Sequence, residues 1–187
     1  MPELRHPDRP LAAADILLRP WARAELEEIH QGMQDPEVPR WTGIPAAIPL
    51  HEVRRRFDAQ PRAARDGEEL MFAIADRDTD RFLGAVSLLR IDWPNARVEV
   101  GYWLAPWGRG RGAASTAVTL LTDWAVATHG FVRVELRIDA RNGASAAVAR
   151  RCGFTYEGTL RSFEWHGDER IDLAVFARVG DEHPSPG

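Results

Sequence analysis

The sequence feature that most constrains the fold is a glycine-rich loop that joins a strand pattern to a helix pattern. Before the loop, apolar residues at 98, 100, 102 and 104 alternate with other residues, which is typical of a strand, and Pro106 ends it. The loop reads WGRGRG over residues 107–112, and from Ala113 to about Val126 apolar residues recur at helical spacing. The sequence therefore predicts a strand, a tight glycine turn and a helix in direct succession.

This succession of elements is suited to binding an anion. Glycine lets the backbone approach a ligand closely, and the first amides of a helix have no partner within the helix and lie at the positive end of its dipole. Arg109 and Arg111 can add charge-assisted contacts to phosphate oxygens. We expect a pyrophosphate here, the alternative being a glycine turn that only connects strand to helix.

Two nucleotide-binding patterns compete for this loop. Gly108, Gly110 and Ala113 satisfy the dinucleotide pattern G-x-G-x-x-G/A, and Asp139 ends the next predicted strand, where an acid could bind a ribose. The residues after Asp139 are few for the further strand and helix units that a dinucleotide fold needs. A mononucleotide P-loop is excluded because the chain contains no lysine. A nicotinamide-dependent enzyme stays open as an alternative.

The composition indicates one soluble globular domain. A chain of 187 residues suits a single core, and 44% hydrophobic with 28% charged residues is ordinary for such a domain. The net charge of -4 argues against a partner that is nucleic acid or a membrane surface. The chain has one cysteine, Cys152, no apolar run of ~20 residues and no signal-like N-terminus, which together favour a cytoplasmic protein.

The remaining patterns alternate between strands and helices around this central unit. Prolines interrupt residues 35–49, so we expect this segment to cover the core and to form one wall of a substrate cleft. We expect an edge strand near 16–21, a helix with Leu26, Ile29 and Met33 on one face, a helix over 51–64, a hairpin of strands 71–76 and 82–92, a strand over 131–139, a helix over 145–151, and two final strands over 153–165 and 170–179.

A second motif lies between Asn142 and Gly158 and reads NGASAAVARRCGFTYEG. Together with the loop, it resembles the GNAT superfamily of N-acetyltransferases, whose turn Gln/Arg-x-x-Gly-x-Gly/Ala opens a helix. Trp107 stands where the superfamily usually has Gln or Arg, and the resulting Trp-Gly-Arg-Gly is typical of the branch that resembles ribosomal-protein-alanine N-terminal acetyltransferases. The N-x-x-S and G-F-x-x-x-G signature of that branch matches Asn142, Ser145, Gly153, Phe154 and Gly158.

The resemblance extends from about residue 15 to residue 178 and implies an α+β fold, with a mixed, mostly antiparallel sheet flanked by helices. Residues 1–14 are then an N-terminal extension and residues 179–187 a flexible tail. It further implies acetyl-CoA as cosubstrate and a strand that splays from its neighbour at 103–105 to receive the pantetheine arm. The resemblance places coenzyme contacts at Trp103, Leu104, Ala105, Trp107, Gly108, Arg109, Gly110, Arg111, Gly112, Ala113, Asn142 and Ser145.

Acetyl transfer to an amine needs a base for the amine and a proton for the departing thiolate. Many GNAT enzymes supply that proton from a tyrosine at the position of Ala149, so Ser145 becomes the candidate donor, with a purely helix-capping role as its alternative. Glu164 is the first candidate base, since the branch carries a glutamate there. Glu99 is the second, and an ion pair with Arg97 competes with that role.

The acceptor is expected to be a primary amine, and a protein N-terminus comes first. An α-amine, with a reference pKa of about 7.7–8.0, needs less help from a base than a lysine amine near 10.4. A small amine such as an antibiotic or polyamine is the alternative acceptor, and a non-catalytic acyl-CoA-binding protein is the alternative function. Trp41, Trp93 and Trp165 are candidate substrate contacts. The spacing of the histidines predicts no metal site, and a monomer and a homodimer both stay open.

Overall fold

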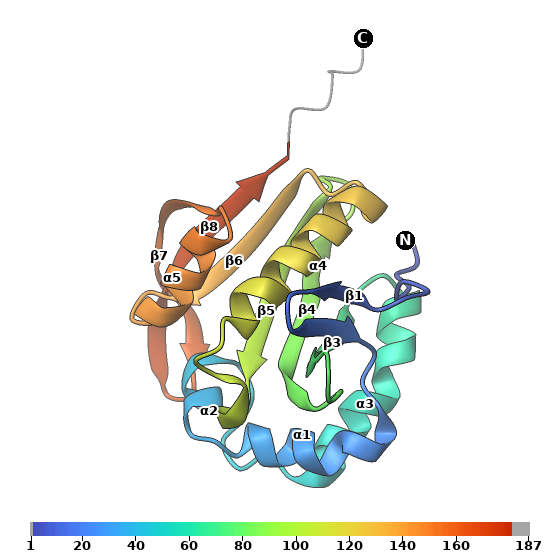
Figure 1. Cartoon of the computed structure of the whole chain (residues 1–187). Helices are drawn as coiled ribbons and strands as arrows, with labels where there is room; N and C mark the ends of the chain where they lie inside the picture. Colours follow the sequence, from blue (N-terminus) through green and yellow to red (C-terminus); the bar gives the residue numbers. More distant parts are fainter. Residues whose placement is uncertain (1, 181–187) are drawn as a thin grey trace.

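The computed structural model describes residues 2–180 of the chain. Apart from a strand over 11–13 and a short helix over 37–41, which the sequence patterns do not predict, its strands and helices follow one another in the expected order (Figure 1). They are β1 (Leu11–Ala13), β2 (Ile16–Arg19), the short turn η1 (Arg23–Glu25), α1 (Leu26–Met33), α2 (Glu37–Trp41), α3 (Leu50–Arg65), β3 (Leu70–Asp76), β4 (Phe82–Asp92), β5 (Arg97–Leu104), η2 (Pro106–Gly108), α4 (Ala113–His129), β6 (Arg133–Asp139), α5 (Gly143–Arg151), β7 (Thr155–His166) and β8 (Glu169–Val179).

The strands form one sheet of eight in the order β1-β2-β3-β4-β5-β6-β8-β7. Neighbouring strands pair antiparallel, except that β5 and β6 run parallel because α4 carries the chain back across the sheet between them. This mixed, mostly antiparallel sheet with helices on both faces confirms the predicted α+β class. None of the helices among residues 2–180 is long and apolar enough to cross a membrane.

Each face of the sheet packs against its own helices. On one face α4 lies along the central strands, as Figure 1 shows, and buries the alternate residues Val98 and Val100 of β5. On the opposite face α1 and α3 cover β3 and β4, with Leu26, Ile29 and Met33 buried as the helical spacing predicts. The period-2 alternation of β5 therefore decides which of its side chains meet which helix.

The N-terminal residues contribute more to the fold than an extension would. Leu4 is buried in the core beneath α4, and its amide donates to the carbonyl of Ala64 at the end of α3. Residues 11–13 form β1, which pairs with β2, so the prediction that the strand at residue 16 lies at the sheet edge is wrong. A strand of three residues gives too few alternations to be recognised in a sequence. At the other end, β8 runs to Val179, and the rest of the expected tail, 181–187, lies outside the described residues.

The two parallel strands separate along their length, and this gap positions the site. β5 pairs with β6 at only three residues, Arg97 to Glu99, although β5 continues to Leu104. From there β6 stays with β8, which pairs with it as far as Asp139. The sheet is therefore open between the second half of β5 and the end of β6.

Candidate active site

A cavity of about 660 Å³ lies where the glycine loop, the start of α4 and the open edge of β5 meet. It continues to the start of α5 and to α2, so segments from both halves of the sheet enclose it. Its lining includes Val38, Trp41, Tyr102, Trp103, Leu104, Arg109, Gly110, Gly112, Ala113, Ala114, Ser115, Asn142, Ser145 and Arg151. We call it the loop cavity.

Backbone geometry makes the floor of the loop cavity. Gly110 and Gly112 have φ of +77° and +80°, values that side chains rarely adopt, and a Cβ atom at either position would meet no neighbour within 4 Å. Gly112 directly precedes α4, and no side chain caps this end of the helix. The amides of the first turn therefore point into open space beside the glycines, which is the geometry that binds phosphate groups.

The residues beside these glycines differ in where they point. The Arg109 guanidinium lies in the loop cavity and donates to the Leu104 carbonyl at 3.1 Å and to Asp35 at 2.7 Å. In contrast, Arg111 turns to Asp15 and Asp76, each at 2.6 Å, and does not line either cavity.

Two other loop residues that the resemblance assigns to the coenzyme have structural contacts. Trp107 packs against the core, and its indole nitrogen donates to the Phe82 carbonyl at 2.7 Å. Gly108 is buried, and a Cβ atom there would come within 2.3 Å of the Leu83 carbonyl oxygen. Both residues thus fix the loop to the start of β4.

The open edge of β5 offers backbone groups to a ligand. The Ala105 amide donates to Leu83 in β4, so it is already engaged. Because successive residues of a strand direct their backbone groups to opposite edges, those of Leu104 and Tyr102 face the gap, where β6 no longer pairs. The predicted separation of this strand from its neighbour is therefore present, and it begins beyond Glu99.

A second cavity, of about 310 Å³, lies on the face of the sheet that α1 and α3 cover. Charged side chains from five elements line it, among them Arg56, Glu69, Arg90, Glu99, Arg137, Asp139 and Glu164. We call it the charged cavity. The two cavities share six residues, which mark their junction: Trp41, Thr42, Tyr102, Trp103, Asn142 and Ser145.

The junction holds a pair of hydroxyl groups. The Asn142 side chain accepts from the Ser145 amide at 2.9 Å and so begins α5, while the Ser145 hydroxyl hydrogen-bonds the Tyr102 hydroxyl at 2.8 Å. Burial raises the pKa of Tyr102 above its ordinary value of 10.0. The sequence pattern singled out Asn142 and Ser145 but missed Tyr102, which reads there only as one more residue of an alternating strand.

The two candidate bases belong to one cluster of charges. Glu99 is 6% exposed, and the guanidinium groups of Arg90 and Arg137 approach its carboxylate oxygens at 2.7 and 3.4 Å. Burial raises the pKa of Glu99, and the two arginines oppose this rise. The Arg90 guanidinium also contacts the carboxylate of Glu164, which lies on β7, at 3.5 Å. The expected partner of Glu99, Arg97, instead pairs with Asp92.

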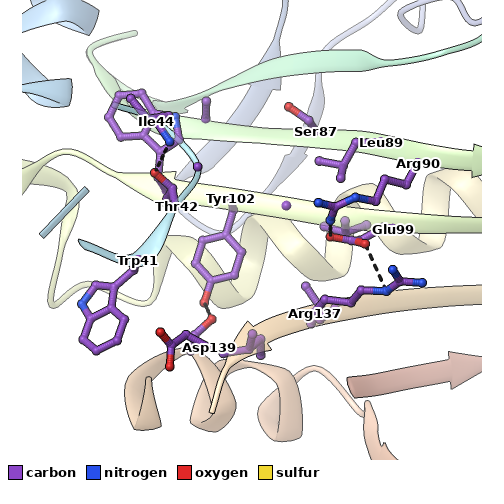
Figure 2. Close-up of a pocket in the computed structure, with 18 of the residues that line it drawn as sticks. Trp41, Thr42, Ile44, Ser87, Leu89, Arg90, Glu99, Tyr102, Arg137 and Asp139 are labelled. Atoms are coloured by element: carbon purple, nitrogen blue, oxygen red, sulfur yellow. Dashed lines mark hydrogen bonds and ion pairs between the residues drawn. The ribbon is translucent and has the colours of Figure 1, made fainter. Parts of the chain in front are cut away.

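Figure 2 shows that the charged cavity has two ends. Tyr102, Trp41 and Asp139 lie at one end, and Arg90, Glu99 and Arg137 lie at the other. Tyr102 lies three positions after Glu99 on β5, which corresponds to about 10 Å along a strand. Glu99 is therefore remote from the junction, and a proton could reach it from there only through water.

The three candidate tryptophans lie in different surroundings. Trp41, from the proline-interrupted segment, lines both cavities, as expected for a wall of the cleft. His166 holds this segment against β7 by a 2.6 Å hydrogen bond to the Pro39 carbonyl. Trp93 donates to Gly67 and packs on Phe131, outside both cavities.

Trp165, the third candidate, is 63% exposed and lines neither cavity. Asp139, considered above as a ribose-binding acid, lies at the junction end of the charged cavity. There it accepts hydrogen bonds from the Arg141 guanidinium, which lowers its pKa.

Residues 15–155 match the family model described as an acetyltransferase (GNAT) domain, and the chain belongs to that family. It is thus an N-acetyltransferase of the GNAT type, which confirms the resemblance that the loop and the second motif indicate.

Relatives with curated names differ in their substrates. The chain is 32% identical over 130 residues to a ribosomal-protein-serine acetyltransferase of Escherichia coli. This alignment covers 70% of this chain and 72% of the relative. It is 26% identical over 180 residues to a spermidine N(1)-acetyltransferase of the same species, which covers 94% of each.

The fold is also similar to solved structures. The ribosomal L7/L12 alpha-N-protein acetyltransferase RimL in complex with coenzyme A aligns with a TM-score of 0.81 at 21% identity, covering 91% of this chain and 98% of that one. The microcin C7 self-immunity acetyltransferase MccE in complex with acetyl-CoA and AMP aligns with a TM-score of 0.81 at 23% identity, covering 89% and 93%.

Proposed function

We propose that this protein transfers the acetyl group of acetyl-CoA to the α-amine of a protein N-terminus, by direct attack of the amine on the thioester. One observation carries this proposal above the others. A backbone-lined loop cavity with the geometry of a pyrophosphate site meets a charged cavity at a junction formed by Tyr102, Ser145 and Trp41. Two substrates that enter from opposite faces of the sheet would meet there.

The residues present suit acetyl-CoA in the loop cavity. The amides at the start of α4 and the Arg109 guanidinium would hold the diphosphate, and the free edge of β5 would pair with the amide groups of the pantetheine arm. Since the Leu104 amide faces the gap, it is the candidate donor to the oxyanion that forms when the amine attacks.

Glu164 is the better candidate for the base. Its side chain is 41% exposed and lies in the charged cavity with a single arginine contact at 3.5 Å, so water can carry a proton from the junction to it. Glu99, in contrast, is 6% exposed and is held by two arginines. We infer that Glu99 orders the arginines and that Glu164 accepts the proton.

The charge of the second cavity suits an amine acceptor. Four carboxylates, Glu69, Glu99, Asp139 and Glu164, line it together with three arginines, Arg56, Arg90 and Arg137, and carboxylates attract a cationic amine. The relative named as a ribosomal-protein-serine acetyltransferase, at 32% identity, supports an N-terminal α-amine as the first candidate acceptor. The relative named as a spermidine acetyltransferase keeps the polyamine as the second candidate acceptor.

The test is an acceptor panel with a matched pair of variants. Purified protein is mixed with acetyl-CoA and either short peptides that differ in their first residues or spermidine, and the release of free thiol is followed. We expect peptides to be acetylated with a higher kcat/KM than spermidine. Release with spermidine alone would contradict the protein acceptor, and no release with any amine would contradict the reaction.

The matched variants are Glu164→Gln and Glu99→Gln. If Glu164 is the base, Glu164→Gln lowers kcat by about 10²-fold or more, while the dissociation constant of CoA stays unchanged. Glu99→Gln keeps most of the wild-type kcat. The reverse ranking of the two variants would transfer the role of the base to Glu99.

A further inference from the structure

The hydroxyl pair at the junction is a half-buried polar contact that connects β5 directly to the start of α5. Tyr102 and Ser145 are 43 residues apart in the chain, and their oxygens approach to 2.8 Å. Both residues line both cavities, so this contact lies where the loop cavity opens into the charged cavity. Position 149, where a tyrosine would stand in many members of the family, holds a fully buried alanine instead.

We propose that Tyr102 supplies, through the Ser145 hydroxyl, the proton that the departing thiol sulfur of CoA takes up. The inference rests on the function proposed above and adds a residue to its mechanism. Because Tyr102 acts through Ser145, it is a positioning and relay residue, and Ser145 is the group that contacts the sulfur.

The proton balance of this step is closed. When the C–S bond breaks, its electron pair stays on sulfur, and the Ser145 O–H proton moves to sulfur and forms the S–H bond. The Tyr102 O–H proton moves to the Ser145 oxygen. The phenolate that is left takes a proton from water in the charged cavity, and Glu164 passes to that water the proton that it accepted from the amine. Acetyl transfer then consumes no external acid.

Local contacts support Tyr102 as the source of the proton rather than Ser145 alone. An isolated serine hydroxyl is too weak an acid to leave its proton on a thiolate, whereas a phenol, with an ordinary pKa near 10, is comparable to a thiol in acidity. The ordinary pKa of a phenol already keeps Tyr102 protonated at neutral pH, and burial raises this pKa further. The Asn142 cap fixes the start of α5 and with it the Ser145 backbone.

The chain contains an unusually close control. It has two tyrosines, and the second, Tyr156, also hydrogen-bonds a hydroxyl at 2.8 Å, that of Thr159. Tyr156 is 50% exposed on β7 and lines neither cavity. Tyr102→Phe and Tyr156→Phe therefore remove the same atom from the same kind of hydrogen bond, and only the first removal affects the junction.

We expect Tyr102→Phe to lower kcat by about 10²-fold with an unchanged dissociation constant for CoA, and Tyr156→Phe to leave kcat unchanged. Ser145→Ala combined with Tyr102→Phe should be no slower than the slower single variant, because both residues act in one relay. Additive losses in the double variant, or an undiminished kcat in Tyr102→Phe, would overturn the relay.

A second readout does not depend on turnover. In Tyr156→Phe protein the only tyrosine is Tyr102, so its ionisation can be followed by ultraviolet absorbance with CoA or with desulfo-CoA, which lacks the sulfur. We expect CoA to raise the pKa of the phenol above its value with desulfo-CoA, because the thiolate lies one hydroxyl away. Equal pKa values would overturn the relay even if acetylation is observed. A raised pKa without acetylation of any amine would leave the relay geometry standing and reject the proposed function.

Discussion

The two cavities of this protein are lined by different kinds of chemical groups. The loop cavity is formed by backbone: two glycines with positive φ, the uncapped start of α4 and the unpaired edge of β5. The charged cavity is formed by side chains from β4, β5, β6 and β7 that contact one another, such as Arg90 between Glu99 and Glu164. The first arrangement binds by the geometry of a short continuous segment, and the second by charges that distant segments bring together.

Under the function proposed above, this difference gives separate tasks to the two halves of the sheet. Amino-acid substitution leaves backbone amides in place, so the loop cavity suits a substrate that is the same for all relatives. Charged side chains can be exchanged one at a time, so the charged cavity suits the substrate on which relatives differ, as the names ribosomal-protein-serine and spermidine acetyltransferase indicate. Four predictions test this division.

The largest effect is expected at a glycine of the loop cavity. Gly112→Ala places a Cβ in the space where the phosphates would lie and strains a residue with φ of +80°, so we expect the affinity for CoA to fall about tenfold. Gly153 has φ of +79° and equally open surroundings but lies outside both cavities. Gly153→Ala is the matched control and should lose similar stability without losing CoA affinity in calorimetric titration. Equal losses of affinity would contradict a backbone-built site.

This same division explains what could be predicted from the sequence. The strand, the glycine loop and α4 are contiguous, so their periodicity and the positions of Gly110 and Gly112 were enough to predict an anion site. Asn142 and Ser145 were found because they match the contiguous N-x-x-S signature of the family branch, and the structure shows that Asn142, not Ser145, caps the helix. A contiguous pattern of this kind is enough to predict the local structure of its segment.

The charged cavity could not be predicted in the same way, because its contacts join residues far apart in the chain. Arg90 and Glu164 are 74 residues apart, and Tyr102 and Ser145 are 43. Arg137 reads in the sequence as one polar residue of an alternating strand, and nothing local shows that it lies against Glu99 across the β5–β6 pair. The register of a sheet decides such contacts, and it depends on the whole fold.

The next effect in size separates the two arginines of the loop. Arg109 lies in the loop cavity, so Arg109→Ala should weaken CoA binding about fivefold through the loss of charge-assisted hydrogen bonds. Arg111 is held by Asp15 and Asp76, and Arg111→Ala should leave the CoA dissociation constant unchanged. An equal loss in both variants would mean that Arg111 leaves its two carboxylates for the phosphates, as the sequence pattern suggests.

A smaller effect concerns how stability depends on pH in the charged cavity. Burial raises the pKa of Glu99 above 4.5, so the folded protein binds this proton more tightly than the unfolded chain does. As pH rises above 4.5 through the raised pKa, wild type should lose stability relative to Glu99→Gln.

Glu157 is the control with the opposite sign. Arg133 lowers its pKa below 4.5, so wild type should lose stability relative to Glu157→Gln as pH falls below that value. Urea unfolding at several pH values measures both differences. A Glu99→Gln variant that becomes steadily less stable than wild type with rising pH would show that the arginines outweigh burial.

The smallest effect distinguishes Trp41 from Trp93, which the sequence analysis presents as equal candidates for a substrate contact. Trp93→Phe removes the hydrogen bond to the Gly67 carbonyl and should cost about 1 kcal/mol of unfolding free energy, with kcat and KM unchanged, since Trp93 lines neither cavity. Trp41→Phe alters the junction, so the KM for the acceptor should rise while stability changes little, because the hydrogen bond that Trp41 donates to Glu37 is exposed. Thermal unfolding and steady-state kinetics on both variants decide between them. If Trp93→Phe instead raised the KM for the acceptor at unchanged stability, the acceptor would extend beyond the charged cavity, towards the far end of β4.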